Sequence, residues 1–131
     1  MNTFEKLSME EERLGKEIID CAYQVHVNLG PGLLEKIYET CFCHELRKKN
    51  LKVMSQISVP IKYDGLIFSE GFRIDVLVEN KVICELKAVN EMNQVYEAQV
   101  LTYMKLTKKR LGFLINFNVP LIKNGIKRII L

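Results

Sequence analysis

Hydrophobic and polar positions alternate along residues 72–78 and again along residues 82–89. Because neighbouring side chains of a strand point to opposite faces, this alternation predicts two strands. Apolar side chains occupy the even-numbered positions, and every charge falls at an odd-numbered one. The even positions of both strands can face one core only if opposed residue numbers sum to an even value. We therefore expect a three-residue loop at residues 79–81, with Val78 opposite Val82.

This register brings two carboxylates together. Asp75 would lie opposite Glu85, with Cβ atoms roughly 5 Å apart. Carboxylates at that distance repel each other unless one is protonated or a cation bridges them. A hard divalent ion with oxygen ligands, such as Mg²⁺, suits the pair. Lys87 shares the face of Glu85 and would lie beside the metal, where it could orient or help deprotonate a bound water.

Helical spacing of apolar residues predicts three helices, and alternation or short apolar runs predict five strands. The helices are expected over about residues 8–28, 33–49 and 94–107. The strands are expected over about residues 51–63, 66–78, 81–89, 111–118 and 126–131. The order α-α-β-β-β-α-β-β is typical of an α/β (α+β) fold, with helices flanking a central mixed sheet.

Composition places few limits on function. Of the 131 residues, 48% are apolar, which predicts one folded domain over residues 1–131. The formal net charge of +3 permits contact with nucleic acid but does not indicate it. There is no membrane-spanning apolar run and no signal peptide, so we expect a cytoplasmic protein. The four cysteines are expected to be reduced and mostly buried.

Two polar side chains have two interpretations each. Glu35 lies in the first turn of the second helix, where it either complements the helix dipole or reaches the metal as a third carboxylate. Gln99 shares a helix face with Tyr96 and Tyr103. It is either an ordinary surface residue or a hydrogen-bonding partner of the substrate or of Lys87. Spacing alone does not decide between these roles.

The carboxylates and the lysine resemble a known signature. Asp75, followed by Glu85-Leu86-Lys87, is similar to the D…ExK motif of the PD-(D/E)XK nuclease superfamily. Ile74 stands where the name of that superfamily has proline. On its own, D…ExK is a weak motif.

Further motifs strengthen the resemblance. Gln99 and Tyr103 look like the QxxxY element of the RecB-like exonuclease branch of that superfamily. The segment GLLEKIY at residues 32–38 is similar to the motif that names the GxxExxY family, a set of small bacterial and archaeal proteins placed in the same superfamily. The resemblance extends over nearly the whole chain, with its motifs in the expected order.

The resemblance implies a restriction-endonuclease-like core and a metal-dependent nuclease, a hydrolase that cleaves phosphodiester bonds in DNA with Mg²⁺ or with Mn²⁺ in its place. Asp75, Glu85, the Leu86 carbonyl and Glu35 would bind the metal. Lys87 would position or activate the water, and Gln99 would steady Lys87 or the substrate. The residues expected to contact the substrate are Tyr103, Tyr38 and Arg73.

Two other hypotheses compete with catalysis. The first is a non-catalytic module that binds nucleic acid or protein and keeps a vestigial nuclease site. The second is a salt-bridged surface on a solvent-facing sheet. Leu77, Ile83 and Val89 share the charged face, so we expect that face to be half covered. A chain of this size has little room for a separate recognition domain, so a homodimer or a partner protein would fit.

Overall fold

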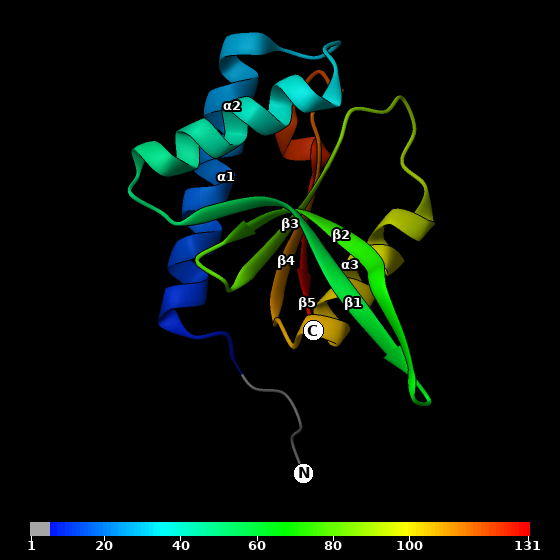
Figure 1. Cartoon of the computed structure of the whole chain (residues 1–131). Coiled ribbons are helices and arrows are strands. Elements are labelled where there is room, and N and C mark those ends of the chain that lie inside the picture. Colours follow the sequence, from blue (N-terminus) through cyan, green and yellow to red (C-terminus); the bar gives the residue numbers. More distant parts are fainter. Residues whose placement is uncertain (1–5) are drawn as a thin grey trace.

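A five-stranded mixed sheet and three α-helices make up the computed structural model, which describes residues 6–131 (Figure 1). In chain order the elements are α1 (Met9–Leu29), α2 (Glu35–Lys48), β1 (Val53–Tyr63), β2 (Leu66–Val78), β3 (Val82–Lys87), α3 (Gln94–Thr107), β4 (Leu111–Asn116), the 3₁₀ helix η1 (Ile122–Gly125) and β5 (Ile126–Ile130). The predicted fold class and element order are confirmed. The predicted domain of residues 1–131 includes five N-terminal residues that lie outside the described range.

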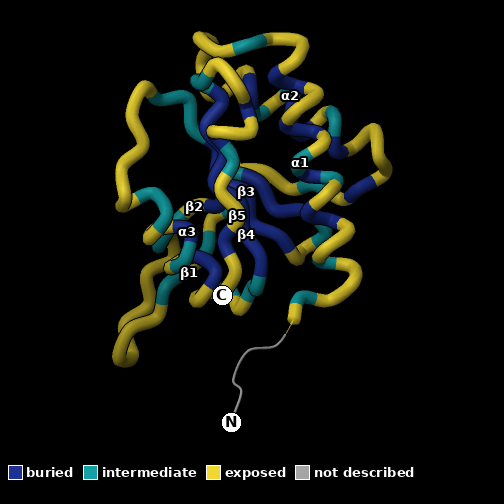
Figure 2. The backbone as a smooth tube through the Cα atoms, turned by 180° about the vertical axis from the view of Figure 1, so that it is seen from behind, coloured by how far each residue is buried: buried dark blue, intermediate teal, exposed yellow. Residues whose placement is uncertain are grey.

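The strands lie side by side in the order β1-β2-β3-β4-β5. Among the strands that the structure describes, only β3 and β4 run parallel, and α3 connects them. Every residue of β4 is buried, and so is every residue of β3 except Lys87 (Figure 2). Such two-sided burial is usual for parallel neighbours covered by helices on both faces. A charged residue within β3 is therefore held in the interior.

Helices cover both faces of the central strands (Figure 1). α1 and α2 pack on the face that carries Val76 and Cys84. α3 packs on the other face, over Leu77 and Ile83. The hypothesis of a solvent-facing, salt-bridged sheet is therefore wrong, because the face that carries the charges lies beneath a helix.

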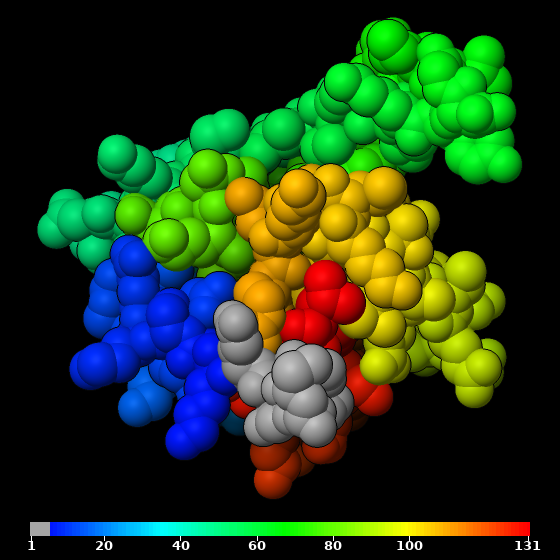
Figure 3. Space-filling model, turned by 90° about the horizontal axis from the view of Figure 1, so that it is seen from below, coloured from blue at the N-terminus to red at the C-terminus, as the bar shows by residue number. Residues whose placement is uncertain are grey.

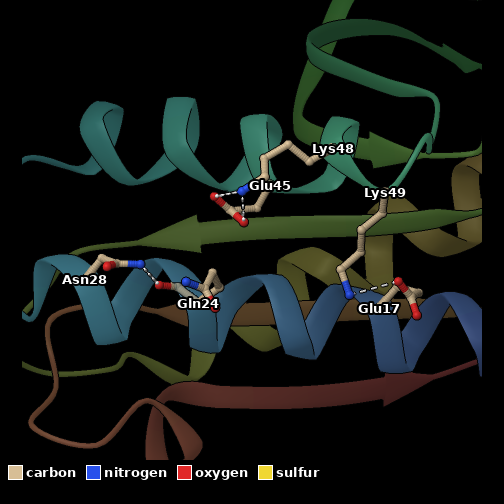
Figure 4. Close-up of polar contacts among 6 residues, drawn as sticks. All are labelled: Glu17, Gln24, Asn28, Glu45, Lys48 and Lys49. Atoms are coloured by element: carbon tan, nitrogen blue, oxygen red, sulfur yellow. Dashed lines mark hydrogen bonds and ion pairs between the residues drawn. The ribbon is translucent and has the colours of Figure 1, made fainter.

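α1 and α2 are fixed at their ends as well as by their packing. Ser8 and Glu11 form a capping box that begins α1. Lys49, which follows α2, pairs with Glu17 of α1 at 2.9 Å (Figure 4).

All four cysteines are free thiols, and Cys41 alone among them is not fully buried. No helix within residues 6–131 combines the length and the apolar character needed to cross a membrane.

The β2–β3 hairpin has the predicted three-residue loop, with Val78 paired to Val82. Glu79 and Asn80 both adopt left-handed backbone conformations, with φ of 52° and 54°. The amide of Lys81 donates to the carbonyl of Val78 at 2.9 Å and closes the turn. The parity argument for the register is confirmed.

The prediction of one continuous apolar face is wrong within β2, between Ile74 and Val76. Phe72 and Ile74 pack in the cluster beneath α3, whereas Val76 lies in the cluster beneath α1 and α2. The strand reverses its faces at Asp75. The β1–β2 ladder pairs residues on both sides of Asp75 and Gln56 but does not pair these two residues with each other.

The far part of the β1–β2 hairpin extends beyond the helices as an arm (Figure 3). The arm turns at Asp64 and Gly65, both with positive φ, as the sequence predicted. Large apolar side chains near this turn are exposed: Tyr63, Leu66, Ile67 and Phe68.

Tyr38 supports the loop that precedes α2. Its side chain is fully buried, and its ring stacks on Phe117 with centroids 4.7 Å apart. Its hydroxyl donates to the carbonyl of Gly30 at 2.6 Å and accepts from the amide of Leu33 at 3.1 Å. The expected substrate contact is therefore not available to Tyr38, because this face of α2 is turned into the core.

Replacing Tyr38 by phenylalanine keeps the ring and removes both hydroxyl hydrogen bonds. We expect the free energy of unfolding to fall by about 1–2 kcal/mol, measured by urea denaturation. We also expect the amide of Leu33 to exchange its hydrogen faster. An unchanged stability together with weaker substrate binding would instead make Tyr38 a substrate contact.

Candidate active site

Asp75 lies where β2 and β3 begin to separate. The recorded β2–β3 pairs end at Val76 and Cys84, and the same register places Asp75 across from Glu85. Asp75 Oδ2 accepts a hydrogen bond from the amide of Leu86 at 2.9 Å. A side-chain carboxylate thus takes the place of a backbone acceptor and fixes Asp75 against β3.

Glu85 is a nearly buried carboxylate, with 6% of its surface exposed. Its Oε1 is buried and has no hydrogen-bond partner among the described residues. Burial raises the pKa of Glu85, the charge of Asp75 raises it further, and Lys87 opposes the shift; the resulting pKa is about 8. In the metal-free protein, Glu85 therefore takes up a proton far more readily than an exposed glutamate does.

Lys87, the last residue of β3, brings a cation to these carboxylates. Its Nζ lies 3.7 Å from Glu85 Oε2. It also lies 4.4 Å from the ring centroid of Tyr96 on α3, a cation–π contact. The sequence placed Tyr96 on the relevant helix face but gave it no role, because the strand it meets is not visible from helix spacing.

Of the two residues predicted on α3, Tyr103 lies at the site and Gln99 makes no contact with it. Tyr103 stacks on Phe72 with centroids 4.3 Å apart and is 8% exposed. Burial, followed by the charges of Glu85 and Asp75, raises the pKa of Tyr103. Gln99 is exposed and makes no side-chain hydrogen bond within residues 6–131, so it does not hold Lys87 here.

α2 presents two carboxylates to the same region. Glu35 remains exposed, but partial desolvation raises its pKa, the charge of Asp75 raises it further, and Lys87 lowers it. Glu39, one turn later, also has a raised pKa, mainly through burial. A pocket of about 300 Å³ is lined by Glu35, Lys36, Glu39 and Gln56. Sequence reasoning missed Glu39, although its i+4 spacing from Glu35 was the available signal.

Two asparagines fix the chain on either side of the site. Asn116, buried at the end of β4, accepts from the amide of Val89 at 3.1 Å and donates to the carbonyl of that residue at 3.0 Å. Asn118 accepts from the amide of Gly32 and donates to Asn90. These bonds hold the segment after Lys87 and the loop before α2. The signal for them was asparagine within an otherwise apolar run.

The structure brings some of the predicted residues together and not others. Asp75, Glu85 and Lys87 form one cluster, Leu86 contributes its amide, and Tyr103 adjoins the cluster. Arg73 lies on β2 with its side chain exposed, beside a pocket formed with Ser58, Glu70 and Phe72.

The donor atoms of the cluster suit a hard cation. Residues 6–131 contain no group of three or more His, Cys, Asp or Glu side chains arranged to bind a metal ion. Two close carboxylates are nevertheless present, and one has a buried oxygen without a hydrogen-bond partner in the described part of the chain. Such an oxygen is costly unless a cation or a proton satisfies it. Backbone carbonyls and water commonly complete an oxygen-ligated Mg²⁺ or Mn²⁺ site, so the residues fit such an ion.

Comparison with known proteins finds a family match over nearly the whole chain. One family model, described as the PD-(D/E)XK nuclease superfamily, matches residues 12–129. Comparisons with curated proteins and with solved structures returned no match. The matched span contains every residue of the site described above, all of α2 and α3, and most of α1. This chain therefore belongs to the PD-(D/E)XK nuclease superfamily.

Proposed function

We propose that this protein is a metal-dependent nuclease that hydrolyses phosphodiester bonds in DNA, with Mg²⁺ as its cofactor. One observation carries the proposal: beside Asp75 and Lys87, Glu85 has a buried carboxylate oxygen that finds no hydrogen-bond partner within residues 6–131. Membership of a nuclease superfamily supports the same reaction. A vestigial site would have no need to keep all three groups in contact.

In this proposal Asp75 and Glu85 would hold the metal through carboxylate oxygens, and the Leu86 carbonyl and Glu35 of α2 would be further ligands. A divalent cation supplies Lewis acidity and lowers the pKa of water at the phosphate. Lys87 orients the attacking water and places positive charge where negative charge develops. The ring of Tyr96 restricts the Lys87 ammonium to this position.

The remaining predicted residues take roles consistent with their exposure. Gln99 and Arg73 present exposed polar groups to the substrate. Tyr103 lines the site beside the carboxylates. Tyr38 is excluded from substrate contact by its burial.

We also propose that the chain belongs to the GxxExxY family within the superfamily, and the linked physical roles of the three motif residues support this proposal. Gly32 has a φ of 97°, a conformation that favours glycine. Tyr38 anchors the loop through Gly30 and Leu33. Glu35 begins α2 and its charge interacts with Asp75.

Nuclease assays with single- and double-stranded DNA and RNA test the reaction directly. We expect cleavage of DNA with Mg²⁺ or Mn²⁺ and none in EDTA. Asp75→Ala and Lys87→Ala should each lower the rate by about 10²–10³-fold, a typical loss for one group that stabilises the transition state. The control Lys62→Ala, an exposed lysine of the arm, should cleave at the wild-type rate.

Two results would contradict this assignment. Activity that survives both Asp75→Ala and Lys87→Ala would locate the chemistry elsewhere. Metal binding without cleavage of any of these substrates would favour the non-catalytic module.

The raised pKa of Glu85 predicts how the stability of the metal-free protein depends on pH. The folded state, with a Glu85 pKa of about 8, binds the proton more tightly than the unfolded chain, where the ordinary pKa is 4.5. Stability in EDTA should therefore fall as pH rises from about 4.5 to about 8. In Glu85→Gln this loss should disappear. At pH 8 in EDTA the variant should be more stable than wild type by roughly 1–3 kcal/mol.

Chemical denaturation across this pH range measures the effect, with the exposed Glu70→Gln as the control that should follow wild type. Mg²⁺ should stabilise the wild type and leave Glu85→Gln unchanged. Parallel pH profiles for wild type and Glu85→Gln would show that Glu85 is not a strained, buried carboxylate.

A further inference from the structure

Gln56, in the middle of β1, adopts a backbone conformation that is unusual for a strand. Its φ is 51°, in the left-handed region that residues other than glycine rarely enter. β1 pairs regularly with β2 on both sides of it, through Ser55 with Val76 and Ile57 with Ile74. The interruption is therefore confined to one position on each strand. Backbone strain confined in this way is often found at functional sites.

The side chain of Gln56 reaches carboxylates on two different elements. Its Nε2 donates to Glu39 Oε1 of α2 at 2.7 Å. The same nitrogen lies 3.4 Å from Asp75 Oδ1, a longer hydrogen bond. One amide group therefore stands between Asp75 and Glu39, with a separate N–H available for each.

Each carboxylate oxygen of Asp75 therefore has a hydrogen-bond donor. Oδ2 accepts from the amide of Leu86, and Oδ1 faces the amide of Gln56. The faces of β2 reverse at this residue, since Ile74 and Val76 pack in different clusters. The reversal and the two hydrogen bonds together fix the direction in which Asp75 presents its oxygens to Glu85.

We propose that Gln56 is a positioning residue, whose strained backbone and side-chain amide hold Asp75 in the orientation that binds the divalent cation and tie it to Glu39 of α2. This inference rests on the proposed function, because it concerns the same metal site. Hydrogen-bond partners of metal ligands typically affect metal affinity by 10–100-fold. Sequence spacing gave no sign of this role, because Gln56 lies at an exposed position of an edge strand.

The substitution Gln56→Met tests the amide. Methionine keeps the length of the side chain and the same backbone constraint, but it has no N–H group. We expect Mn²⁺ affinity, measured by calorimetry, to fall about tenfold. Gln24→Met is the matched control: Gln24 lies on α1 (Figure 4), its side chain is exposed, and the substitution should leave the affinity unchanged.

The substitution Gln56→Gly distinguishes the effect of the side-chain amide from the effect of the strained backbone. Glycine enters the left-handed region without penalty, so this variant should be at least as stable as Gln56→Met. Its Mn²⁺ affinity should nevertheless be reduced to a similar extent, because it too lacks the amide. A purely structural role predicts the opposite, with affinity recovering as stability recovers.

A metal-free measurement keeps this inference distinct from the proposed function. Hydrogen exchange of the Leu86 amide, followed in EDTA, reports whether Asp75 Oδ2 still holds it. We expect faster exchange in Gln56→Met than in wild type or Gln24→Met. If wild type binds no Mn²⁺ but this difference appears, the metal site fails and the positioning role stands. Wild-type exchange in Gln56→Met, with wild-type Mn²⁺ affinity where wild type binds the ion, would overturn the inference.

Discussion

The burial of a carboxylate in the central strand is the constraint on which the rest of this site depends. β3 is covered by α1 and α2 on one face and by α3 on the other, so Glu85 has almost no contact with water. An isolated buried charge is costly, and Asp75 adds repulsion to that cost. Lys87 relieves only part of it. The arrangement is stable with a proton in metal-free protein, and it is suited to a cation that replaces the proton.

The surrounding elements keep these groups from moving apart. Leu86 and Gln56 each hold one oxygen of Asp75, and the Tyr96 ring lies against Lys87. Asn116 fixes the chain just beyond Lys87 through Val89. Asp75 is held by contacts between neighbouring strands, and Tyr96 adds a contact from α3. The site therefore depends on the pairing of the strands as well as on the packing of a helix against the sheet.

The sequence predicted the β2–β3 hairpin but did not predict the tertiary contacts around it. The parity of the opposed residue numbers alone predicted the three-residue loop between Val78 and Val82, because strand periodicity is a local property. Parity could not show that β2 reverses its faces at Asp75. The left-handed backbone of Gln56, on the neighbouring strand, does not change the alternation of apolar and polar residues in the sequence. The role of Tyr96 depends on which strand meets α3. The GxxExxY motif identified Tyr38 without telling whether its hydroxyl faces the solvent or the core.

The central claim is that Asp75 and Glu85 together bind a divalent cation. Crystals soaked in MnCl₂ at pH 8 and measured at the manganese absorption edge test it most directly, because anomalous scattering locates the ion without assumptions about activity. We expect one peak in contact with a carboxylate oxygen of Asp75 and with Glu85 Oε1. No peak between these residues, or a peak bound only by other groups, would contradict the account.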